Sequence, residues 1–245
     1  MKKIILLLVL IIFSLSASMA YAINYDGIWF MGFNLSKTFF QGDSGLILRK
    51  TISLAIDKKK INREFGEEDA FPKSLVPKGM EGHDEGSVKG LQYNPASAIK
   101  TLKTIKTDVL PSQITLLHTD GMKTQAFAQY IKDDLARIGV KVMLVEIPYS
   151  QQEKWVNSMI SGKYDMFLLG YKALDAKKTE TLIEPVFKTK GEANFMFFSD
   201  TEVDTKIDNL KKSTIKPARE EIIKKLNSYL IQKYVMVPLF YIESF

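Results

Sequence analysis

Cysteine is absent from this sequence, and histidine occurs only twice, at His83 and His118. The absence of cysteine excludes a disulfide scaffold, thiolate metal sites and a lipid-modified cysteine behind a signal sequence. The stability of the chain must therefore come from an ordinary apolar core. With 46% hydrophobic and 25% charged residues, the composition supports such a core in one or two domains.

The scarcity of histidine also weakens two possible chemical sites. Gly42-Asp43-Ser44-Gly45 is similar to the nucleophile segment of trypsin-like proteases, but a serine nucleophile needs a histidine base and an oxyanion hole. We interpret this segment as a turn before a helix. His83-Asp84-Glu85 contains metal-ligand residue types, yet adjacent loop residues rarely bind a metal without further ligands. We expect a solvated loop there, and a chain without a catalytic centre, metal or cofactor.

An excess of one charge sign is also lacking. The formal net charge of +6 falls to +4 when Lys2 and Lys3 are left out, and no acidic residue precedes Ala22. Basic and acidic residues are interleaved, so we expect no nucleic-acid partner. The short lysine runs at 58–60 and 177–178 are most simply solvated faces.

The first residues have the pattern of a secretory signal peptide. Lys2-Lys3 precedes an apolar run from Ile4 to Phe13, and Ala20-Tyr21-Ala22 has the form of a cleavage site. The alternative is an uncleaved membrane anchor, but the run falls short of the roughly 20 residues that a span needs. We therefore predict a signal peptide at residues 1–22, a mature domain at residues 23–245 and a periplasmic location.

Alternating strand and helix patterns follow in the mature chain. A βαβαβ pattern from Ile114 to Tyr171 predicts a largely parallel sheet and an α/β fold. Asn94-Pro95, Ser150 to Glu153 and Ser199 to Glu202 have the form of helix starts. The expected strands are 28–33, 114–118, 140–147, 166–169 and 237–242, and the expected helices are 47–61, 95–107, 125–138, 150–160, 200–212 and 217–230.

The strand Met166–Leu169 is an unbroken apolar run, as expected for a strand buried on both faces. We expect Gly170 to end it, so that Tyr171, Lys172 and Asp175 follow in the loop at its carboxyl end. In open α/β sheets, ligands bind outside these strand ends. We therefore name Tyr171, Lys172 and Asp175 as candidate ligand-binding residues. The alternative is a surface loop without a binding role.

Three other side chains have simpler interpretations. Trp155 and Met159 lie one helical turn apart and are predicted to be core residues rather than ligand contacts. His118 ends a predicted strand close to Asp120, where a hydrogen-bonded structural histidine is more common than a ligand contact.

The order of these segments resembles the carboxyl-terminal half of the extracytoplasmic solute-binding proteins, family 5, of peptide and nickel ABC importers. The resemblance rests on segments whose order and spacing also match: Leu48 to Asp57, Leu75 to Met80, Tyr93-Asn94-Pro95, Ile138 to Val142 and Val237 to Tyr241. It implies a lobe like that of type II periplasmic binding proteins with a mostly parallel sheet. It also implies binding of a peptide or other small solute and an ABC importer permease as partner.

Two departures from the family pattern matter. Family members are considerably longer, so the resemblance implies that most of one lobe is missing before Ile28. After the buried strand the family often has Gly-Trp-x-x-Asp, whose Asp can pair with a peptide's amino terminus. Here Gly170 to Leu174 occupies that position, and Asp175 comes one residue late. We expect a ligand to be held by Tyr171 stacking and by Lys172, with free amino termini poorly recognised.

The missing lobe also leaves a second function open. The chain is alternatively a non-catalytic periplasmic interaction module, in which the surface left by that lobe contacts a partner chain. The strands near Trp29 and Leu239 would then lack neighbours, and unpaired strand edges promote association. We therefore expect self-association or marginal stability.

Overall fold

The computed structural model describes residues 24–65, 71–84, 92–105 and 110–244. The strands are β1 Tyr25–Phe33, β2 Ile114–His118, β3 Val142–Glu146, β4 Met166–Lys172 and β5 Met236–Glu243. The helices are α2 Gly42–Ala55, α3 Lys58–Glu64, α4 Pro95–Leu102, α5 Met122–Arg137, α6 Gln152–Ile160, α7 Glu180–Phe187, α8 Thr201–Lys212 and α9 Lys216–Lys233, with 3-10 turns η1 Thr38–Phe40 and η3 Tyr149–Gln151. The predicted signal peptide lies outside the described residues.

The five strands form one sheet in the order β3-β2-β4-β1-β5. β2 is parallel to β3 and to β4, whereas β1 is antiparallel to both of its neighbours, β4 and β5. Four strands therefore run in one direction and β1 runs against them. The predicted βαβαβ unit is confirmed as β2-α5-β3-α6-β4, and the fold is α/β with a mostly parallel sheet.

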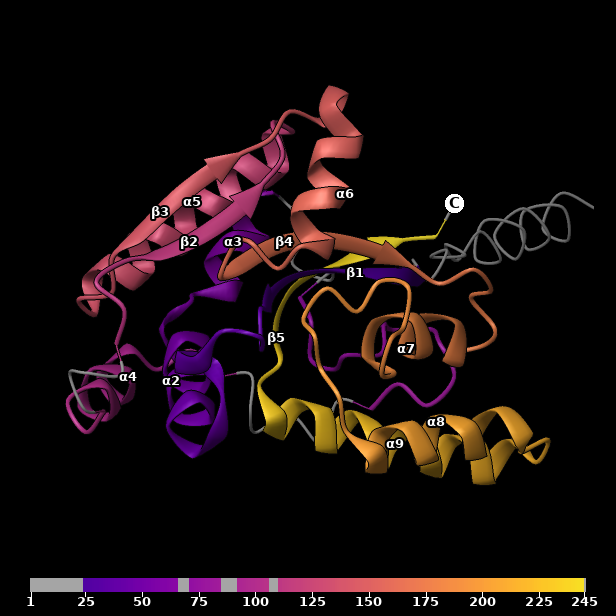
Figure 1. The fold of residues 1–245 in the computed structure, drawn as a ribbon. Helices are drawn as coiled ribbons and strands as arrows, with labels where there is room; N and C mark the ends of the chain where they lie inside the picture. The colour runs from indigo at the N-terminus through magenta and orange to yellow at the C-terminus, as the bar shows by residue number, and fades with distance from the viewer. Residues whose placement is uncertain (1–23, 66–70, 85–91, 106–109, 245) are drawn as a thin grey trace, which may run out of the picture.

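Helices cover the sheet on both sides. In Figure 1, α5 lies along β2 and β3, α6 stands beside β4, and α7, α8 and α9 lie together on the other side of β1 and β4. α2 packs against α4, and α3 packs against β5. Among the described residues, no helix is long and apolar enough to cross a membrane.

β1 is the central strand of the antiparallel part of the sheet. Phe30, Met31 and Phe33 are fully buried, which confirms the predicted aromatic strand. The expectation that the strand near Trp29 lacks a neighbour is wrong, because β1 pairs along both edges. Within the described residues β5 pairs only with β1. The pairing has a register shift around Leu239, whose carbonyl accepts a hydrogen bond from Asn62 Nδ2 at 2.8 Å. This side-chain hydrogen bond satisfies the Leu239 carbonyl group, which the register shift leaves without a partner on β1.

The predicted helix 47–61 is two helices. α2 ends at Ala55, and Asp57 starts α3 by accepting a hydrogen bond from the Lys60 amide at 3.0 Å. Gly42 to Gly45, predicted to be a turn, forms the start of α2 instead. Gly45 lies directly against the backbone of Phe40, where a Cβ atom would come within 2.1 Å of the Phe40 carbonyl carbon. This close contact between η1 and α2 requires glycine.

The three predicted helix starts have different outcomes. Asn94 caps α4 as predicted, accepting from the Ser97 amide at 2.9 Å, although α4 ends at Leu102. The capping box at Ser150 is wrong, because a 3-10 turn occupies that position and α6 has no side-chain cap. α8 starts one residue later than predicted, because its cap is Asp200 rather than Ser199, with bonds from the Glu202 and Val203 amides. Local sequence placed these helix starts better than it identified their caps.

β4 extends beyond its predicted end. Gly170, Tyr171 and Lys172 are strand residues, because the antiparallel pairing with β1 continues through Gly27–Lys172. The prediction that Tyr171 and Lys172 lie in a loop is therefore wrong, and of the three candidate residues only Asp175 lies in the loop. The sequence pattern gave no expectation for α7, which contains Pro185 in its interior.

Candidate functional site

The sheet opens between β2 and β4. These strands pair at Leu116–Met166 and Leu117–Phe167, whereas β2 pairs with β3 along its whole length. In the sheet, β3 lies on one side of β2, and β4, the next strand in the chain, lies on the other side of β2. The strand order therefore reverses between β2 and β4. In α/β sheets, ligands bind in the crevice outside the carboxyl ends of the two strands at such a reversal.

A cavity of about 200 Å³ lies at this opening, between β1, β4 and α6. Its lining is largely apolar and includes the two tryptophans of the sequence. The principal lining residues are Trp29, Tyr149, Trp155, Val156, Leu168 and Gly170. Apolar and aromatic walls with few polar groups are typical of sites for small molecules and for peptide side chains.

Aromatic contacts hold the two tryptophans in place. The Trp29 ring packs edge-on against Phe127 at 6.3 Å between centroids, and Trp155 packs edge-on against Phe195 at 6.4 Å. Trp155 Nε1 is buried, and it has no hydrogen-bond partner among the described residues. A buried N–H group without a partner costs free energy.

The sequence prediction for this helix holds only in part. Met159 is 3% exposed and belongs to the core, as predicted. Trp155 packs against the core and also lines the cavity, which the sequence reasoning missed. Its position early in a helix that follows the carboxyl end of a strand was the available signal. No sequence signal marked Trp29 as a cavity residue, because its contact with β4 depends on strand pairing.

Tyr171 belongs to β4 but is not among the cavity-lining residues. Its hydroxyl donates a hydrogen bond to Glu192 Oε1 at 3.1 Å. Burial, together with the neighbouring Glu192 carboxylate, raises the pKa of Tyr171 to about 12. Successive strand residues face opposite sides, so Tyr171 points away from the face to which Gly170 belongs.

Lys172 and Asp175 are engaged by separate groups. Lys172 Nζ lies 3.1 Å from Asp26 Oδ1 and donates to the Glu243 carbonyl at 3.0 Å. Asp175 Oδ1 accepts from the Lys177 amide at 2.9 Å, and its Oδ2 lies 3.9 Å from Lys178 Nζ. The structure therefore gives Tyr171, Lys172 and Asp175 three different partners and does not join them in one cluster.

The histidines have structural contacts. His118 is 4% exposed, and its Nδ1 lies 2.8 Å from the Thr119 carbonyl oxygen, as expected for a hydrogen-bonded strand-end histidine. His83 Nδ1 lies 2.7 Å from the Val76 carbonyl oxygen. The part of the chain that the structure describes contains no group of three or more potential metal-ligating side chains. Glu85, the third residue of His83-Asp84-Glu85, lies outside that part.

Comparison with known proteins agrees with this architecture. A crystal structure of a putative peptide binding protein AppA from Clostridium difficile superimposes with a TM-score of 0.78 at 18% identity, over 90% of this chain and 45% of that one. A solved peptide-binding protein of a peptide ABC transporter has a TM-score of 0.75 at 19% identity, over 88% of this chain and 98% of that one. The fold is thus that of a solute-binding-protein lobe.

The family follows from sequence. The model described as bacterial extracellular solute-binding proteins, family 5 Middle, matches residues 12–194, and this chain belongs to that family. The probable ABC transporter periplasmic-binding protein SapA of Escherichia coli K12 is 24% identical over 221 residues. That match covers 86% of this chain and 38% of SapA, so the chain spans well under half of this relative's length.

Proposed function

We propose that this chain binds a peptide or other small solute and passes it to the permease of an ABC importer, without catalysing a reaction. The observation that carries the proposal is the position of Trp29 and Trp155, which line one cavity where the strand order reverses. The peptide-binding proteins with the same fold support a peptide-type ligand. We further propose that residues 1–22 are a cleaved signal peptide and that residues 23–245 act in the periplasm.

The cavity volume limits what can enter it. About 200 Å³ accommodates one side chain or a small solute, not a whole peptide. Its apolar walls favour an aliphatic or aromatic group. The ligand backbone would then lie outside the cavity, across the carboxyl ends of β2 and β4.

Isothermal titration calorimetry against short peptides that carry one aliphatic or aromatic side chain tests this function. We expect heat of binding that is lost in Trp155→Leu and kept in the control Tyr93→Leu, since Tyr93 is exposed and outside the cavity. Absence of heat with every peptide and small solute tested would contradict the proposal, as would equal binding by both variants.

One observation favours the second candidate, a protein interaction module. Met122, Tyr149 and Leu174 are 87%, 71% and 84% exposed, and they follow the carboxyl ends of β2, β3 and β4. Large apolar side chains gathered at one sheet edge are typical of interaction surfaces. A stable complex recovered with the purified chain, combined with no heat from any peptide, would favour this module.

A further inference from the structure

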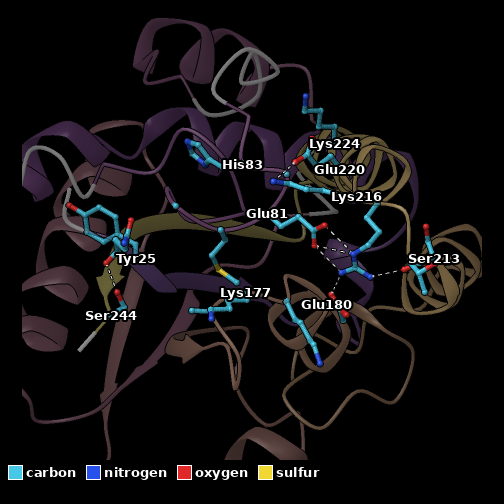
Figure 2. Close-up of a pocket in the computed structure, with 18 residues that line it drawn as sticks. Tyr25, Glu81, His83, Lys177, Glu180, Ser213, Lys216, Glu220, Lys224 and Ser244 are labelled. Atoms are coloured by element: carbon cyan, nitrogen blue, oxygen red, sulfur yellow. Dashed lines mark hydrogen bonds and ion pairs between the residues drawn. The ribbon is translucent and has the colours of Figure 1, made fainter. Parts of the chain in front are cut away.

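A second hollow, separate from the tryptophan cavity, lies between the loop after β4, the segment around residues 79–83 and the start of α9. It is an open groove of about 1030 Å³ with walls of mixed polar and apolar character, and Figure 2 shows the side chains around it. Five basic and three acidic residues line it, so it carries a net positive charge. This groove shares no lining residue with the tryptophan cavity between β1, β4 and α6.

A fully bonded arginine holds the two sides of this groove together. Arg219, on α9, pairs with both oxygens of Glu81 at 2.9 to 3.1 Å and with Glu180 at 2.6 Å. It also donates to the carbonyls of Leu210 and Ser213. The Glu81 and Glu180 carboxylates therefore face Arg219 rather than the open groove (Figure 2). All the guanidinium donors are used, so Arg219 positions the groove and has none left for a ligand.

The lysines, in contrast, are available. Lys177 and Lys178 come from the loop after β4, and Lys216 and Lys224 come from α9, where they are two turns apart on one face. All four are exposed. Neither Lys177 nor Lys224 has a side-chain partner among the residues that the structure describes, and the other two have only long ion pairs of 3.9 Å. The groove thus presents cations from two different parts of the chain.

An exposed apolar residue accompanies the lysines on each of these elements. Leu174, three residues before Lys177, is 84% exposed, and Ile215, directly before Lys216, is 67% exposed; both adjoin lining residues in the chain but do not line the groove themselves. Paired basic and apolar groups fit a polypeptide that mixes carboxylates with apolar side chains. A phosphate or a nucleic acid backbone would use the lysines and leave both apolar residues in water. A bilayer surface would not follow the concave groove.

We propose that this groove is a docking site for an acidic segment of a partner polypeptide. Carboxylates of the segment pair with Lys177 and Lys224, and its apolar side chains pack on Leu174 and Ile215. Because these lysines are exposed, their pairs are individually weak and depend on ionic strength. The docking is therefore reversible, and it does not require the tryptophan cavity to be filled.

Fluorescence anisotropy tests the site with a labelled peptide in which glutamate and leucine alternate. We expect binding at low salt, weaker binding at physiological salt, and an about tenfold loss of affinity in the double variant Lys177→Gln, Lys224→Gln. The control is Lys50→Gln, Lys141→Gln, which removes the same charge from exposed lysines outside the groove and should bind like the unmodified chain.

Three results would overturn the proposal. The first is an equal loss in the control variant, which would indicate a response to net charge alone. The second is equal binding of a peptide with glutamine in place of glutamate. The third is tighter binding to polyphosphate or to anionic lipid vesicles than to the acidic peptide. The variant Trp155→Leu should bind the acidic peptide like the unmodified chain. The experiment therefore distinguishes a failure of the docking proposal from a failure of the proposed solute binding.

Discussion

The Trp29 indole leaves no room for a side chain at Gly170 on the neighbouring strand. The two residues are paired across β1 and β4, and a Cβ atom at residue 170 would lie 2.7 Å from Trp29 Cε2. Gly170 therefore sets the position of one wall of the cavity. Gly170, which the sequence predicts to end the strand, instead lets the Trp29 ring pack directly against the backbone of β4.

Gly170→Ala should displace the Trp29 ring, destabilise the fold by about 1–3 kcal/mol and weaken solute binding. Urea unfolding and calorimetry measure the two effects. Gly121→Ala is the control, because its Cβ atom would meet only ordinary contacts at 3.4 Å or more. Its cost should stay near the roughly 1 kcal/mol of a changed helix cap. Equal effects of both changes would contradict the role given to Trp29.

Trp155→Phe should keep the aromatic wall and remove the unpartnered Nε1–H group. We expect the free energy of unfolding to stay within about 1 kcal/mol of the unmodified value, since an N–H group that lacks a partner contributes no stability. Affinity for ligands with an aliphatic or aromatic side chain should change little, because the phenyl ring keeps the aromatic wall. A large loss of affinity for these ligands would show that the indole N–H group contacts the ligand.

Arg219→Met should destabilise the protein by about 2–4 kcal/mol, because it leaves Glu81 and Glu180 largely buried without their cation. Thermal unfolding of this variant is compared with that of Arg63→Met, which removes an exposed arginine from α3. Adding Glu180→Gln to Arg219→Met should restore part of the loss. If Arg219→Met lowers the free energy of unfolding less than Arg63→Met does, the ion pairs of Arg219 with Glu81 and Glu180 add no stability.

Lys58 should make stability rise with pH. The residue is 1% exposed, so the prediction of a solvated face at residues 58–60 is wrong for Lys58, and burial lowers its pKa from 10.5 to about 8. Between those values the unfolded chain binds more protons than the folded one, so the free energy of unfolding increases with pH. We expect an increase of about 2 kcal/mol between pH 8 and 10. It should be absent in Lys58→Met and present in Lys59→Met, whose lysine is exposed.

Acetylating the amino terminus of a bound peptide should change its affinity less than about threefold. An amino group that approached Asp175 would compete with the Lys177 amide and Lys178 for its carboxylate oxygens. Calorimetry with paired free and acetylated peptides measures the difference. A large loss on acetylation that Asp175→Asn abolishes would show that Asp175 pairs with the amino terminus. Lys172 contributes little to anion binding on this view, because Asp26 already holds it.

The sequence by itself determined the local elements. The apolar run Met166–Leu169 and the amphipathic pattern before Gly139 predicted a buried strand and a helix, because burial of neighbouring residues follows the period of each element. Their alternation predicted the parallel βαβαβ unit and the α/β class. Cap residues such as Asn94 marked a helix start for the same local reason, since the side chain reaches an amide only three residues away.

Only the tertiary structure decided the sites. Trp29 and Gly170 are far apart in the chain and meet because β1 inserts antiparallel between β4 and β5. The same pairing extends β4 and places Lys172 beside Asp26. Arg219 finds Glu81 through the packing of α9. Such contacts depend on which distant segments pack together, and neither the periodicity nor the propensity of a segment contains that information.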